Sequence, residues 1–160
     1  MQHLFEKTPR TDAFWHAYAH AHGVTGDYDV IAFGDSPAMA TELADLVVAG
    51  VKRATAGLMR DFETGAEAPP KIGGHVVIVD GEGAPRAIWR TMELRVGPLI
   101  SVTESFAWDE GEGLRTREDW LDGHRSFFAR QAEREGFAMD DDIETVFERF
   151  RIVWPPEIAD

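Results

Sequence analysis

The sequence predicts an α+β fold in which a small, curved antiparallel sheet or barrel is decorated by helices. Two observations lead to this prediction. Hairpin signals, such as the turn Gly81-Glu82-Gly83 between two apolar runs, dominate over the strand–helix–strand crossovers that build parallel sheets. The second observation is that the predicted helices are inserted between some of the strands and do not alternate with them one by one. From the length of 160 residues we expect one domain, residues 1–160, with an N-terminal helical extension over residues 1–27.

Four segments have apolar residues at the three- to four-residue spacing of a helix face. They predict helices over residues 10–22, 36–49, 103–109 and 117–135. In the second helix Ser36 is a suitable N-cap, and Gly50 is a suitable residue to follow the last turn. The expected buried face of this helix consists of Met39, Leu43, Leu46 and Val47.

Runs of β-branched and aromatic residues predict the strands, over residues 28–33, 53–59, 75–80, 85–96 and 144–153. Residues 61–74 contain paired prolines and paired glycines, so we expect a loop there. In the strand 85–96, Arg86 and Arg90 fall on the same face because side chains alternate along a strand. That face either is solvated and carries cross-strand ion pairs, or it faces an anion.

Composition limits the possible functions. The chain has 29 acidic and 16 basic residues, a net charge of −13, and no cysteine. An acidic chain repels polyanions at long range, so we expect no DNA partner, and any contact with RNA must be local. The lack of cysteine excludes disulfides and thiol chemistry. No apolar run reaches membrane-spanning length, so we expect a cytoplasmic protein without a membrane partner.

The first candidate site is the turn Gly50-Val51-Lys52-Arg53-Ala54-Thr55, between a predicted helix and a predicted strand. Such a turn is able to place an ammonium group and a hydroxyl group beside one small cavity. The ammonium supplies a positive charge, or a base if desolvation lowers its pKa. The hydroxyl supplies a hydrogen bond or a nucleophile. The alternative is structural, with a solvated lysine after a helix and a threonine that favours a strand.

The second candidate site is the acidic, glycine-containing segment Asp109–Gly113. Its carboxylates repel one another, which raises the pKa of at least one of them and favours a nearby cation. The segment is therefore a candidate for a general base, a metal site or a counter-charge for Lys52. The alternative is a flexible, solvated loop. His124, on the helix 117–135, is either a buried interface histidine or a site residue. His16 and His20 lack the downstream carboxylate of a zinc motif, so we predict surface histidines, no metal ligands and no cofactor.

Four stretches together resemble the ASCH domain family, which has a PUA-like fold, a small β-barrel. They are residues 33–36, 43–55, 104–113 and 120–128, and the resemblance extends from about Phe14 to Trp154. It implies a ligand site in the barrel cleft and a link to RNA or modified nucleosides. Some small members are amidohydrolases that remove the acyl group from N4-acylcytidine. This chain is similar to the larger bacterial members and differs from the small enzymes in its N-terminal helix and its Glu-Gly-Glu-Gly segment.

The resemblance implies that Lys52, Thr55 and Glu110 are the catalytic residues. Thr55 would attack the amide carbonyl with neutral Lys52 as its base, and Glu110 would hold Lys52 or pass a proton to the leaving amine. A close carboxylate opposes the neutral form of lysine. If Lys52 stays charged, it is better suited to stabilise an oxyanion or to bind phosphate.

A second hypothesis is an RNA-binding protein or ribonuclease that uses the same cleft, with short RNA in place of a modified nucleoside. The residues expected to bind substrate or RNA are Arg53, Arg86, Arg90, Trp108, His124 and Ser126. Together with Lys52 and Arg60, the arginines would form a local basic patch. Trp108 would stack on a base or pack in the core. A homodimer is compatible with this sequence but is not required by it.

Overall fold

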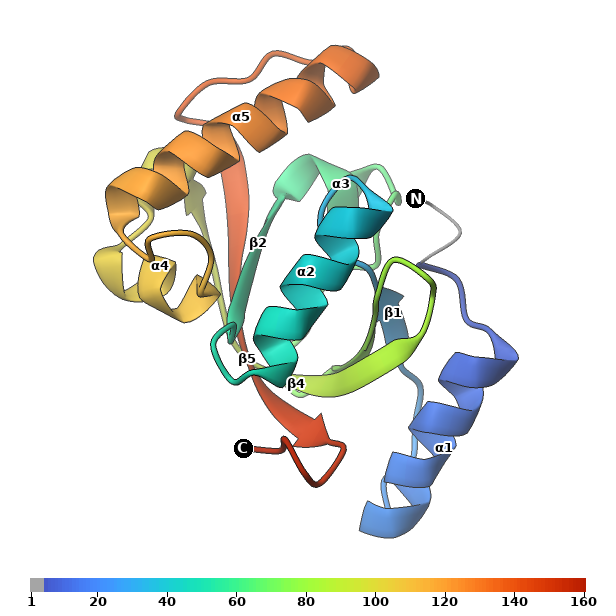
Figure 1. Ribbon diagram of the computed structural model, residues 1–160. Helices are drawn as coiled ribbons and strands as arrows, with labels where there is room; N and C mark the ends of the chain where they lie inside the picture. Colours follow the sequence, from blue (N-terminus) through green and yellow to red (C-terminus); the bar gives the residue numbers. More distant parts are fainter. Residues whose placement is uncertain (1–4) are drawn as a thin grey trace.

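The computed structural model describes residues 5–160 and consists of one curled sheet with helices on its faces and edges (Figure 1). The helices are α1 (Pro9–His22), α2 (Pro37–Val48), α3 (Met59–Glu63), α4 (Glu104–Glu110) and α5 (Arg117–Glu135), with a 3-10 turn at Leu99–Ser101. The strands are β1 (Asp29–Ile31), β2 (Ala54–Leu58), β3 (His75–Val79), β4 (Pro85–Pro98) and β5 (Glu144–Trp154). Among the described residues, no helix is both long enough and apolar enough to cross a bilayer.

The sheet has the strand order β1-β3-β4-β5-β2, and it forms a half-barrel. The long strands β4 and β5 pair antiparallel, and two irregularities in their register help the sheet to curl. The α+β class and the curved sheet are therefore confirmed. The sheet is mixed rather than wholly antiparallel, because β1 pairs with β3 in parallel, with Val30 opposite Val77. Three residues of β1 carry too little signal for the direction of pairing to be predicted.

The predicted helix boundaries hold to within one or two residues, because local capping groups determine them. Ser36 accepts a hydrogen bond from the backbone N–H of Met39 and so begins α2. Gly136 ends α5 in the left-handed conformation, with φ of 74°. One segment differs from the prediction. The expected loop 61–74 begins with helical residues, since α3 occupies Met59–Glu63.

The predicted buried face of α2 is correct at Val47 but otherwise wrong by part of a turn. Ala40, Ala44 and Val47 are fully buried against the sheet, whereas Met39 and Leu43 are only partly buried. The small alanine side chains let the helix approach β3 and β4 closely, and this contact cannot be read from hydrophobicity alone. Met39 and Leu43 line a cavity instead.

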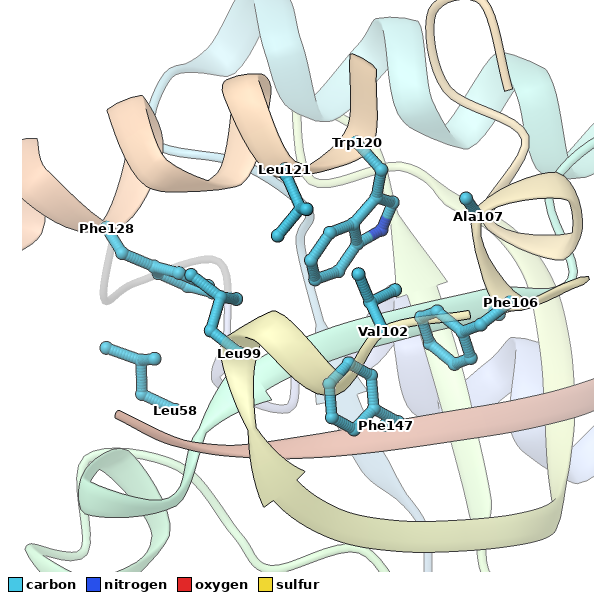
Figure 2. Packing of buried hydrophobic residues seen from close by; sticks show 10 residues of the cluster. Leu58, Leu99, Val102, Phe106, Ala107, Trp120, Leu121, Phe128 and Phe147 are labelled. Carbon is cyan, nitrogen blue, oxygen red and sulfur yellow. The ribbon is translucent and has the colours of Figure 1, made fainter. Parts of the chain in front are cut away.

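The core has three parts. One lies under α1, and a second lies under α2 around Trp89, which stacks on Phe150 at 4.3 Å. The third joins α4 and α5 to the sheet (Figure 2). There Trp120 projects from α5 toward Phe147 of β5, and Phe128 lies beside Leu99 (Figure 2). This packing holds α5 above the Lys52 turn.

Candidate functional site

A cavity of about 290 Å³ lies where α2, β2, the end of α4 and α5 meet. Its lining includes Lys52, Thr55, Glu110 and His124, so the structure brings together four of the residues expected from the sequence. Glu112 lines the cavity as well. Lys52 and Thr55 are close together in the sequence, whereas Glu110, Glu112 and His124 follow much later in the chain, and the fold brings the two segments to one cavity.

Lys52 is positioned by a tight turn after α2. Gly50 takes a φ of 82°, and the backbone N–H of Lys52 donates to the carbonyl of Leu46 at 3.2 Å. The next residue, Arg53, donates its N–H to the carbonyl of Asp109 at 2.7 Å, which joins this turn to the end of α4. The side chain of Lys52 consequently points inward and is only 1% exposed.

The ammonium group of Lys52 has a complete set of partners. Its Nζ donates to the carbonyl of Ala54 at 2.8 Å and to Oε2 of Glu112 at 2.8 Å. A longer bond of 3.4 Å reaches the carbonyl of Glu110, whose Oε1 lies 3.8 Å away. The ring of Phe33 lies under the same group, with its centroid 5.0 Å from Nζ. These contacts all favour the charged form of lysine.

Glu110 is the last residue of α4, and its side chain is only 2% exposed. Its Oε2 accepts a hydrogen bond from Nε1 of Trp120 at 2.9 Å and lies 3.3 Å from Nε2 of His124. Its other carboxylate oxygen faces Lys52. A buried carboxylate with three donors or cations around it acts as an anchor for the site.

His124 stacks on Trp120, with ring centroids 3.7 Å apart. Its Nδ1 lies 2.9 Å from the carbonyl of Trp120, one turn earlier in α5, and its Nε2 faces Glu110. Because both ring nitrogens face oxygen acceptors, the doubly protonated imidazolium satisfies the site best. Contacts at both ring nitrogens therefore fix the orientation of the His124 ring, and its side chain is part of the site.

The electrostatics of this cluster follow from these contacts. Burial by itself would lower the pKa of Lys52, but Glu110 and Glu112 outweigh it and raise that pKa above its ordinary value. Burial likewise opposes the ionisation of Glu110, yet Lys52 and His124 hold its pKa well below the usual range. Burial raises the pKa of Glu112 to about 7, with Lys52 opposing and neighbouring Glu110 reinforcing the shift. The pKa of His124 is raised, because Glu110 outweighs the effect of burial.

Thr55 is the second residue of β2, and its half-buried side chain lines the cavity. It comes three residues after Lys52, and the intervening Ala54 is fully buried and gives its carbonyl to the ammonium group. The turn and the first residues of β2 therefore present a charged nitrogen and a hydroxyl group to one cavity, as the spacing in the sequence suggested.

The other expected binding residues lie outside this cavity. Arg53 pairs with Asp160, and Arg86 pairs with Asp45. Arg90 is exposed and lies opposite His75 in the sheet. Trp108, 58% exposed, packs under the guanidinium of Arg115, and Ser126 is exposed on α5. The arginines therefore do not converge on Lys52.

The sequence argument chose Glu110 and passed over Glu112 as an individual site residue. Both stand in the acidic segment 109–113, which was the signal for a site, but their separate roles depend on how the chain turns after α4. Gly111 between them has a φ of 74°, which reverses the chain and lets both carboxylates face Lys52. Trp120, the donor to Glu110, had no local signal beyond its apolar character.

Oxygen and nitrogen atoms of Glu110, Glu112 and His124 lie within 4.8 Å of one another, a set that is able to hold a metal ion. The ammonium group of Lys52 lies 2.8 Å from the carboxylate of Glu112 and 3.8 Å from that of Glu110. It therefore already supplies a cation to both carboxylates. The two carboxylates therefore have the ammonium group of Lys52 as their counter-ion.

Known proteins share the fold of this chain. The family model described as ASCH domain matches residues 29–154. An ASCH domain structure from Lactobacillus crispatus JV V101 is 27% identical, with a TM-score of 0.82, covering 92% of this chain and 96% of that one. A protein from Enterococcus faecalis V583 is 32% identical, with a TM-score of 0.81, covering 89% of this chain and 87% of that one. No curated protein matches the chain. The chain belongs to the ASCH domain family.

Proposed function

We propose that this cleft hydrolyses the acyl amide of N4-acylated cytidine or of a related modified nucleoside. The observation that carries the proposal is the buried, charged Lys52, held by Glu110 and Glu112 beside a cavity that also presents the hydroxyl of Thr55. A fixed cation and a nucleophile in one pocket suit acyl transfer. The resemblance to small amidohydrolases of the family supports the same chemistry.

The proposed roles differ from the simplest scheme, in which neutral Lys52 is the base. Lys52 has a raised pKa and is a poor base, so it acts as a cation. Glu110 is ionised, buried and bound to Trp120, so it holds the cation in place. Glu112 has a pKa of about 7 and lines the same cavity as Thr55. A general base is most effective when its pKa lies near the working pH, so we assign Glu112 as the proton acceptor.

The reaction then proceeds in two halves. The Thr55 oxygen attacks the amide carbonyl while its proton passes to Glu112, and Lys52 stabilises the oxyanion through the N–H that now makes the long 3.4 Å bond. The intermediate collapses, the C–N bond breaks, and Glu112 gives its proton to the leaving amine. Water then attacks the threonine ester with Glu112 again as base, which releases the carboxylic acid and restores Thr55.

The alternative function, binding or cutting of short RNA at the same cleft, has less support. A phosphate-binding surface needs several cations that are not already neutralised. Arg53, Arg60 and Arg86 each lie in an ion pair with a carboxylate. The chain carries a net charge of −13 as well.

The deciding experiment is the release of cytidine from N4-acetylcytidine by the wild type and by Thr55→Ala, Thr55→Ser, Lys52→Met and Glu112→Gln. We expect turnover by the wild type, partial turnover by Thr55→Ser, and almost none by the other variants. Glu144→Gln, at the exposed start of β5, is the control and should match the wild type. Folded wild-type protein that fails to release cytidine, and instead binds or cuts short RNA in a salt-dependent way, would refute the amidohydrolase proposal.

A further inference from the structure

A second, larger cavity adjoins the first on the concave side of the sheet. Its volume is about 750 Å³, within the range of small-ligand sites. The two cavities share the residues Phe33, Gly34, Thr55, Ala56, Phe127 and Phe128. A ligand whose reacting group lies at Thr55 therefore has room for the rest of its structure in the second cavity. No part of the mechanism described above uses this space.

Glu148 of β5 is the cross-strand partner of Thr55 of β2. The antiparallel register of β2 and β5 places these two residues directly opposite each other. Residues that are opposite in an antiparallel pair project from the same face, with Cβ atoms roughly 5 Å apart. Thr55 and Glu148 both line the second cavity, and Glu148 is only 6% exposed.

The carboxylate of Glu148 is held in one orientation by the residues behind it. Its Oε2 accepts a hydrogen bond from the hydroxyl of Thr91 at 2.5 Å, and that hydroxyl accepts one from Nε1 of Trp89 at 3.3 Å. A carboxylate has about four acceptor positions, so a single bond to Thr91 leaves most of them for other donors. An oriented acceptor at the wall of a cavity is the usual means of fixing a bound hydroxyl or amino group.

The lining of the second cavity has more acidic than basic residues. Its acidic lining residues are Asp29, Asp35, Asp61, Glu67, Glu135 and Glu148, against Arg134 as its basic residue. Among residues 5–160, neither Glu67 nor Glu148 forms an ion pair. Burial raises the pKa of each of these two carboxyl groups to about 7. Asp35, Asp61 and Glu135 are paired with arginines. A phosphate placed here would therefore face the uncompensated charge of Asp29, and of Glu67 and Glu148 when these two are ionised.

We propose that Glu148 is a specificity-determining residue, which accepts hydrogen bonds from the hydroxyl or amino groups of an unphosphorylated nucleoside and excludes its phosphorylated forms. This inference rests on the proposed function, because it places the acyl end of the substrate at Thr55. The substrate class is then the free nucleoside, and neither the nucleotide nor the RNA chain.

The test compares kcat/KM for N4-acetylcytidine and for N4-acetylcytidine 5′-monophosphate at pH 8, where Glu148 is ionised. We expect the wild type to prefer the nucleoside at least roughly tenfold, since a phosphate would lie near the like charge of a buried carboxylate. Glu148→Gln keeps the acceptor for Thr91 and removes the charge, so it should reduce this preference severalfold and raise KM for the nucleoside. Glu144→Gln, an exposed residue of the same strand, should leave the preference unchanged.

The outcomes separate this inference from the proposed function. Equal hydrolysis of both compounds by the wild type, or the same preference in Glu148→Gln, would overturn the role of Glu148 while amidohydrolase activity stands. If the wild type hydrolyses neither compound, the proposed function fails, and calorimetric binding decides the inference. Cytidine that binds the wild type more tightly than cytidine 5′-monophosphate does, with the difference lost in Glu148→Gln, would support it. No binding of cytidine would overturn it.

Discussion

Gly111 lies against the Lys52 turn so closely that a Cβ atom on it would come within 2.5 Å of the carbonyl oxygen of Val51. This contact joins the end of α4 to the turn after α2, and the hydrogen bond from Arg53 to the carbonyl of Asp109 lies beside it. The glycine also reverses the chain, with φ of 74°, so that Glu110 and Glu112 flank the ammonium group of Lys52. The geometry of the cluster therefore depends on a residue without a side chain.

Gly111→Ala should destabilise the protein and disrupt the site. The left-handed backbone and the collision with Val51 together are expected to lower the free energy of unfolding by about 2–4 kcal/mol. Gly136→Ala is a matched control, because Gly136 ends α5 with the same φ of 74° and a Cβ there would meet nothing within 4 Å. Urea unfolding of both variants measures the difference. If both lose the same stability, the close contact with Val51 contributes nothing.

Lys52→Met should be strongly destabilising, although methionine fills a similar volume. The substitution removes one of the two cationic neighbours of the buried Glu110 carboxylate and leaves His124 as the other, and breaking a buried pair costs about 3–5 kcal/mol. The double variant Lys52→Met/Glu110→Gln removes both charges and should recover a large part of this loss. Denaturant unfolding of the two single variants and the double variant gives the coupling energy. Additive effects would contradict the pairing.

Glu112→Gln should remove the acid limb of the pH–rate profile. In the wild type, kcat/KM for N4-acetylcytidine should rise as pH increases through about 7, because Glu112 acts in its deprotonated form. Without this general base we expect the rate to fall by roughly 10²–10⁴-fold and to lose that dependence. Glu104→Gln, at the exposed start of α4, is the control. A wild-type profile that is flat between pH 5 and 9 would contradict the role of Glu112.

Glu148 should make the protein less stable as pH rises. Its pKa is raised by burial from 4.5 to about 7 in the folded protein, so the folded state binds this proton more tightly than the unfolded state does. The contribution of Glu148 to stability is therefore fully present below pH 4.5 and is lost as pH rises to about 7. That shift corresponds to about 3 kcal/mol at most.

Glu148→Gln cannot ionise, so its free energy of unfolding relative to the wild type should be higher at pH 8 than at pH 5. Urea unfolding at the two pH values measures this change. Glu144→Gln, which is exposed, should show no such difference. A difference between Glu148→Gln and the wild type that is the same at both pH values would show that Glu148 ionises normally in the folded protein.

The sequence by itself determined the features that depend on neighbouring residues. Ser36 and Gly136 set the ends of their helices through local hydrogen bonds and backbone conformation, and Gly81-Glu82-Gly83 marks the hairpin between β3 and β4. The spacing from Lys52 to Thr55 predicted two polar groups beside one cavity, because a tight turn followed by a strand has little freedom. The curved sheet was predicted from the hairpin signals, and the ASCH family from the resemblance of four stretches in their order along the chain.

The tertiary structure alone decided which distant groups meet. The parallel pairing of β1, the charge of Lys52, the separate roles of Glu110 and Glu112, and the opposition of Thr55 and Glu148 all depend on contacts across the fold. A pKa depends on burial and on charges within a few ångströms, and strand register depends on packing on the buried face. The pKa values and the strand register both depend on distances between residues in space, and the order of residues along the chain does not give these distances.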